Sequence, residues 1–156
     1  VAAMDLFGDL LENGRSDGIP NRIGVVSYSD TATVNMALTN VDANLRNPGS
    51  PFDNAKTAIT SGGPGGCTGI GAALQQAGAM LCPPGDCQGF SAPGDNDRKG
   101  ILLLTDGVEN VAPCLQPAGP AGGSCSSQCF GAAVDLNKLE FTQLVAVGFG
   151  STTPRS

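Results

Sequence analysis

The run Ile101–Leu104 constrains the fold more than any other stretch, because it sets four branched apolar residues in a row before Thr105, Asp106 and Gly107. A strand covered by helices on both faces has such a continuous apolar run, whereas a strand with one face in water alternates. We therefore predict a buried strand that ends at Thr105. Asp106 then lies at its carboxyl end, where open α/β sheets bind ligands, although aspartate is also an ordinary turn residue.

Composition excludes several classes of function. The 156-residue chain has a net charge of −6, which argues against a nucleic-acid surface, because such a surface needs clustered lysine and arginine. The chain has no histidine, so imidazole catalysis, Ser-His-Asp triads and histidine metal ligands are excluded. No motif assembles a nucleophile with a base, or a pair of carboxylates. We therefore predict that the chain is not an enzyme.

Six cysteines lack the spacing of a zinc site, which favours disulfides in an oxidising compartment, extracellular or at the cell surface, over reduced thiols. Cys82 and Cys87 flank a helix stop and are expected to form a bridge, and Cys114 is expected to pair within its own loop or with Cys67. No apolar run approaches the length of a membrane span, so direct membrane insertion is not expected. The six are Cys67, Cys82, Cys87, Cys114, Cys125 and Cys129.

Hydrophobic periodicity predicts alternating helices and strands. Apolar residues three or four apart indicate helices, and short runs rich in β-branched residues indicate strands. The expected helices are 1–13, 52–59, 70–81 and 131–141, and the expected strands are 22–29, 31–38, 101–105 and 142–150. So few residues separate the first two strands that an antiparallel hairpin must join them. The pattern is typical of an α/β fold with a doubly wound, mostly parallel sheet and one antiparallel edge strand.

A glycine-rich loop, Ser61–Gly69, precedes the expected helix 70–81. The loop lacks the Gly-Lys-Ser/Thr ending of a phosphate-binding loop, and no GxGxxG motif opens a helix directly behind a strand, so nucleotide binding is disfavoured. Thr68 stands at the start of the helix. Its simplest interpretation is an N-cap, a structural role that needs no ligand.

Four segments, in this order along the chain, resemble the von Willebrand factor type A (vWA) domain, which has a Rossmann-like fold. They are RIGVVSYSD at 22–30, CTGIGAAL at 67–74, LLLTDGVEN at 102–110 and VAVGFG at 145–150. The resemblance implies a metal-ion-dependent adhesion site at the carboxyl edge of the sheet, with Thr68 and Asp106 as metal ligands. Hydroxyl and carboxylate oxygens suit Mg²⁺ or Ca²⁺. Thr68 and Asp106 are therefore expected to lie close together, with Asp30 or backbone groups near Gly107 as the next oxygens.

The chain also departs from the vWA pattern. The family opens with a central strand that ends in an Asp-x-Ser-x-Ser motif, and this motif does not occur in the sequence. We expect residues 1–150 to be a partial vWA domain that lacks the strand between strands 22–29 and 101–105. Residues 151–156 are expected to be a tail leading toward the missing last helix and strand. With fewer ligands, binding of Mg²⁺ or Ca²⁺ is expected to be weak or absent.

Two functions follow from the resemblance. The first is an extracellular, adhesion-type domain that binds a protein through a divalent cation, with an acidic residue of the partner completing the metal site. The alternative is a vWA scaffold domain that binds no metal, within a larger surface protein or secreted enzyme. An upstream Asp-x-Ser-x-Ser segment would favour the first function, and its loss would favour the second.

Overall fold

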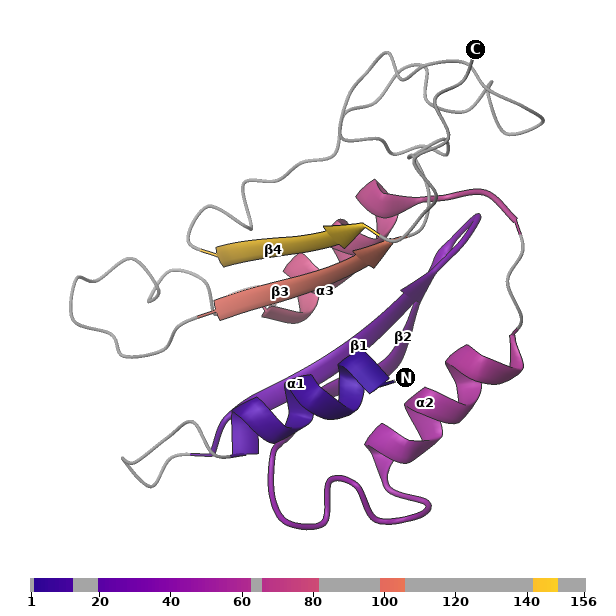
Figure 1. Ribbon diagram of the computed structural model, residues 1–156. Coiled ribbons are helices and arrows are strands. Elements are labelled where there is room, and N and C mark those ends of the chain that lie inside the picture. The colour runs from indigo at the N-terminus through magenta and orange to yellow at the C-terminus, as the bar shows by residue number, and fades with distance from the viewer. Residues whose placement is uncertain (1, 13–19, 63–65, 82–98, 106–141, 149–156) are drawn as a thin grey trace, which may run out of the picture.

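The computed structural model describes residues 2–12, 20–62, 66–81, 99–105 and 142–148. In these ranges the protein is a mixed α/β structure with three helices and two small sheets (Figure 1). The helices are α1 (Ala2–Glu12), α2 (Pro51–Ser61) and α3 (Ile70–Leu81), and the strands are β1 (Arg22–Tyr28), β2 (Ala32–Asn40), β3 (Lys99–Thr105) and β4 (Thr142–Gly148). The expected helix 131–141, the tail 151–156 and the expected Cys82–Cys87 bridge lie outside the described residues.

The hairpin predicted from the sequence is present, because β1 and β2 pair antiparallel and Tyr28 lies opposite Ala32 beside the turn. A shift in register makes Asn35 an extra residue of β2 between the partners of Val25 and Val26. Such a bulge bends the strand and increases its twist. β3 and β4 pair in parallel with a constant register.

The described strands form two separate pairs, and the break between them falls between β1 and β3. The sequence predicted a doubly wound sheet that lacks one strand at this place. A doubly wound sheet requires hydrogen bonds from each strand to the next, and among the described residues no ladder joins β1 to β3. The arrows of β1 and β3 nevertheless point the same way in Figure 1. The mixed α/β class is therefore confirmed, and the doubly wound sheet stays a prediction.

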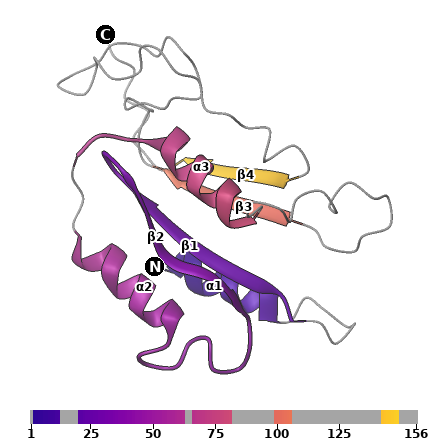
Figure 2. The same cartoon turned by 180° about the vertical axis from the view of Figure 1, so that it is seen from behind.

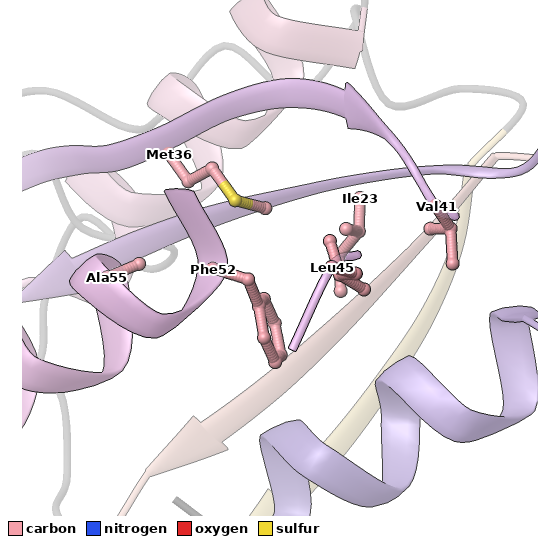
Figure 3. Packing of buried hydrophobic residues seen from close by; sticks show 6 residues of the cluster. All are labelled: Ile23, Met36, Val41, Leu45, Phe52 and Ala55. Carbon is pink, nitrogen blue, oxygen red and sulfur yellow. The ribbon is translucent and has the colours of Figure 1, made fainter. Parts of the chain in front are cut away.

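A first core cluster packs α1 and α2 against the β1–β2 hairpin. Phe52 is fully buried, and the side chains of the cluster gather around it in Figure 3. Met4, Phe7 and Leu11 pack against this cluster from α1, because a spacing of three and four residues puts them on one helical face. The cluster consists of Ile23, Met36, Val41, Leu45, Phe52 and Ala55.

Local chemistry explains where α2 begins. The Ser50 hydroxyl accepts a hydrogen bond from the Asp53 backbone N–H at 3.1 Å, which is the usual N-cap contact. Pro51 occupies the first turn, where its missing N–H costs nothing. Gly49 precedes the cap with a φ of +81°, a value that favours glycine. The helix therefore starts one residue earlier than the sequence pattern predicted.

The third helix lies on the other side of the strands and contacts both pairs. A Cβ atom on Gly24 of β1 would lie 2.8 Å from the Met80 sulfur, so α3 approaches β1 closely at this glycine. Ile70 and Leu74 of α3 form a second buried cluster with Leu103 of β3. Figures 1 and 2, seen from opposite sides, show α1 and α3 on opposite faces of the strands. Because α3 contacts both β1 and β3, it joins the two strand pairs.

Candidate functional site at the carboxyl end of β1

The segment Gly66–Gly69, which contains Thr68, is fastened to the chain directly after β1. The Cys67 backbone N–H donates a hydrogen bond to Asp30 Oδ1 at 2.6 Å. The Gly69 backbone N–H donates to the Ser29 carbonyl oxygen at 2.9 Å. Thr68, which is half-buried, therefore lies between two anchored residues at the carboxyl end of β1.

Two glycines are required for this close approach. Gly66 has a φ of +85°, a left-handed conformation that costs other residues energy. A Cβ on Gly66 would also lie 3.0 Å from Asp30 Oδ1. A Cβ on Gly69 would lie only 2.9 Å from the Ser29 carbonyl oxygen, closer than real Cβ atoms come to other atoms. The glycines thus let the loop backbone lie directly against Ser29 and Asp30.

The N-cap position of α3 falls on Gly69, one residue later than the sequence pattern predicted. α3 begins at Ile70, and the Ala73 N–H donates to the Gly69 carbonyl oxygen at 3.2 Å. The residue whose carbonyl accepts that bond is the N-cap, so the cap is Gly69 and Thr68 precedes it. Periodicity alone does not distinguish these adjacent positions.

The end of β3 lies near the same edge. The Tyr28 hydroxyl, at the end of β1, donates a hydrogen bond to the Leu104 carbonyl oxygen at 2.6 Å. Leu104 and Thr105 are the last two residues of β3, so β1 and β3 end on the same side of the molecule. Asp106 follows immediately and lies outside the described residues. Its expected approach to Thr68 remains a prediction.

Cys67 is disulfide-bonded, as expected for a chain with a disulfide framework. It is the only cysteine among the described residues, so its partner lies outside them and the expected choice of Cys114 stays open. The bond adds a covalent restraint one residue before Thr68. The loop is therefore held by a carboxylate, a carbonyl oxygen and a disulfide within three residues.

The available oxygens suit a hard cation in kind but are few in number. Thr68 provides a hydroxyl. The Asp30 carboxylate accepts a hydrogen bond from the N–H of Cys67, the residue before Thr68. Calcium takes six to eight oxygen ligands, and magnesium takes six. No cluster of three or more cysteine or acidic side chains suited to a metal occurs in the described part of the chain. Thr68 and Asp30 together offer three side-chain oxygens, fewer than either ion takes.

Sequence reasoning placed Asp30 among the neighbouring oxygens but gave it no role. In the structure the Asp30 side chain bonds the backbone of the Thr68 loop, over a separation of 37 residues. Its position directly after a buried strand was the available signal, because that position lies at the ligand-binding edge of α/β sheets. The sequence contained no signal for its hydrogen-bond partner.

No protein-family model matches the chain, and no curated protein or solved structure matches it. The similarity to vWA domains therefore depends on the four sequence segments that carry it. Among the described residues, no helix has both the length and the apolar character needed to cross a membrane.

Proposed function

We propose that this chain is part of an extracellular protein-binding domain of the vWA type, in which Thr68 and Asp106 contribute to a divalent-cation site. On this proposal the two strand pairs belong to one doubly wound sheet, and the strand that the chain lacks would lie between β1 and β3. The attachment of residues 66–69 to Asp30 is the observation that carries the proposal, because it keeps Thr68, the proposed hydroxyl ligand, near the carboxyl end of β1. The hydrogen bond from Tyr28 to Leu104 supports it further, since β3 ends beside β1 and leads into Asp106.

The cation of the proposal is Mg²⁺ or Ca²⁺, because hydroxyl and carboxylate oxygens are the ligands these ions prefer. The protein partner would supply a carboxylate as a further ligand. With so few oxygens from this chain, we expect a dissociation constant on the order of 10⁻³ M or weaker, at or beyond the weak end for extracellular calcium modules.

The alternative is a scaffold that binds no cation, and one observation favours it. Asp30 Oδ1 already accepts the Cys67 N–H, and two glycines and a disulfide complete the attachment of the loop. These contacts stabilise the loop whether or not an ion binds. The two proposals differ in what substitution of Thr68 and Asp106 does to cation binding.

Terbium luminescence tests the proposal. Tyr28 is the only tyrosine and the chain has no tryptophan, so tyrosine excitation reports on Tb³⁺, a calcium substitute, bound near the end of β1. We expect a signal that Ca²⁺ or Mg²⁺ displaces, and we expect the double variant Thr68→Ala, Asp106→Asn to lose most of it.

The matched control is the double variant Thr57→Ala, Asp42→Asn. Thr57 lies on the exposed face of α2 and Asp42 lies in the exposed turn after β2, so this variant removes the same chemical groups away from the site. It should bind Tb³⁺ as the unmodified chain does. Equal titration curves for the two double variants would refute the cation-binding proposal and leave the scaffold.

A further inference from the structure

We infer that Asp30 is a positioning residue for Thr68: its carboxylate fixes the Cys67 peptide and thereby the orientation of the next residue. The use of that orientation in cation binding rests on the function proposed above. The positioning itself rests on the contacts around Gly66–Gly69.

The two hydrogen bonds of the loop restrict Thr68 from both sides. The Cys67 N–H is held by Asp30 at 2.6 Å and the Gly69 N–H is held by the Ser29 carbonyl oxygen at 2.9 Å. The Gly66–Cys67 peptide and the Thr68–Gly69 peptide are thus both held, so the backbone of Cys67 and Thr68 between them loses freedom. The backbone then sets the direction of the Thr68 Cα–Cβ bond, and the side chain is limited to a few staggered rotamers about it.

The two anchors differ in how they depend on the sequence. The Ser29 contact is a hydrogen bond between backbone groups, so substitution of the Ser29 side chain does not remove it. The Asp30 contact uses a side-chain oxygen, and a hydrogen bond to a carboxylate is about twice as strong as one between neutral groups. Asp30 is thus the side chain on which the loop conformation depends.

The packing around Asp30 indicates a closely fitted contact. The Asp30 carboxylate lies so near Gly66 that a Cβ there would be 3.0 Å from Oδ1 and 3.3 Å from Oδ2. Gly66 therefore leaves space that the carboxylate occupies. The disulfide of Cys67 restrains its side chain, whereas the Asp30 bond restrains its peptide group, so the two restraints are complementary.

Amide hydrogen exchange on the full chain tests the inference without requiring a cation. We expect Asp30→Ala to raise the exchange rate of the Cys67 amide at least about tenfold, the effect of losing one hydrogen bond to a charged group. We expect Asp30→Asn to restore most of the protection, because the amide oxygen still accepts the bond. The Thr68 amide and methyl resonances should shift in Asp30→Ala and return toward their original positions in Asp30→Asn.

The matched control is Asp42→Ala. Asp42 Oδ1 also accepts a backbone hydrogen bond, from Asn44 at 2.8 Å, and it is also exposed. This variant should leave the exchange of Cys67 and the resonances of Thr68 unchanged. Unaltered Cys67 protection in Asp30→Ala, or equal loss in the alanine and asparagine variants, would overturn the inference.

Terbium titration of the same variants separates this inference from the proposed function. If both hold, Asp30→Ala weakens Tb³⁺ binding severalfold and Asp30→Asn restores much of it. If the unmodified chain binds no Tb³⁺ while the exchange and resonance changes appear as expected, the proposed function fails and the positioning role is supported.

Discussion

Gly66 takes the backbone of the Thr68 loop through the left-handed region, with a φ of +85°. The position also lies against the Asp30 carboxylate, so it is limited both by backbone conformation and by space. Of the two described glycines with a positive φ, only Gly66 combines these two restrictions. Gly49 has a similar φ, but a Cβ there would meet nothing within 4 Å.

We predict that Gly66→Ala lowers the free energy of unfolding by about 1–2 kcal/mol, the usual cost of a left-handed alanine, with a further loss if Asp30 must move. Gly62→Ala is the control, because Gly62 has an ordinary helical φ of −68°. A compatible glycine-to-alanine change is neutral or slightly stabilising. Urea unfolding of the two variants measures the difference, and equal midpoints would contradict the role given to Gly66.

At the scale of elements, α3 joins two strand pairs that share no hydrogen-bonded ladder among the described residues. Leu74 is 1% exposed and packs in the second cluster with Leu103 of β3. Phe52 is 0% exposed and packs in the first cluster, with α1, α2 and the hairpin. The two clusters therefore stabilise different parts of the molecule.

We predict that Leu74→Ala costs about 2–5 kcal/mol and Phe52→Ala about 3–5 kcal/mol, the usual range for cavities in a core. Hydrogen exchange should separate them. Leu74→Ala should speed exchange most in β3 and β4, and Phe52→Ala should do so most in α2 and the hairpin. Gln75→Ala, on the exposed face of α3, is the control and should change neither region. Identical exchange patterns for Leu74→Ala and Phe52→Ala would show that the two clusters act as one.

At the scale of the whole molecule, the strands have edges that no described strand pairs, and β4 has exposed apolar side chains. Among the described residues, β1 pairs only with β2, and β3 pairs only with β4. Leu144 and Val145 of β4 are 47% and 48% exposed, and neighbouring residues of a strand point to opposite faces. Uncovered strand edges and apolar faces favour association between chains.

We predict that the 156-residue chain associates as its concentration rises and melts over a broad range of temperature. Val145→Lys should reduce the association, because a charge on β4 opposes pairing with another chain. Leu10→Lys removes an equally apolar side chain from α1, where Leu10 is 63% exposed, and should have less effect. Sedimentation and calorimetry are the measurements. A monomer at high concentration with a sharp two-state melt would contradict this prediction.

The sequence by itself determined the elements that depend on local pattern. The helix Ile70–Leu81, the hairpin of β1 and β2, and the strand ending at Thr105 follow from the spacing of apolar residues, and the structure has all three. Local spacing carries this information because helices and strands repeat every 3.6 and 2 residues. Element ends were less certain, and α2 begins before its predicted start.

Only the tertiary structure decided how these elements meet. The parallel pairing of β3 with β4, the packing of α3 across both strand pairs and the bond from Asp30 to Cys67 depend on contacts between residues far apart in the chain. No local pattern encodes the partner of such a contact, because the same aspartate satisfies its hydrogen bonds equally well in a turn or against a distant loop. Thr68 became a candidate ligand through its sequence motif, whereas its attachment to β1 through Asp30 was visible only in the folded chain.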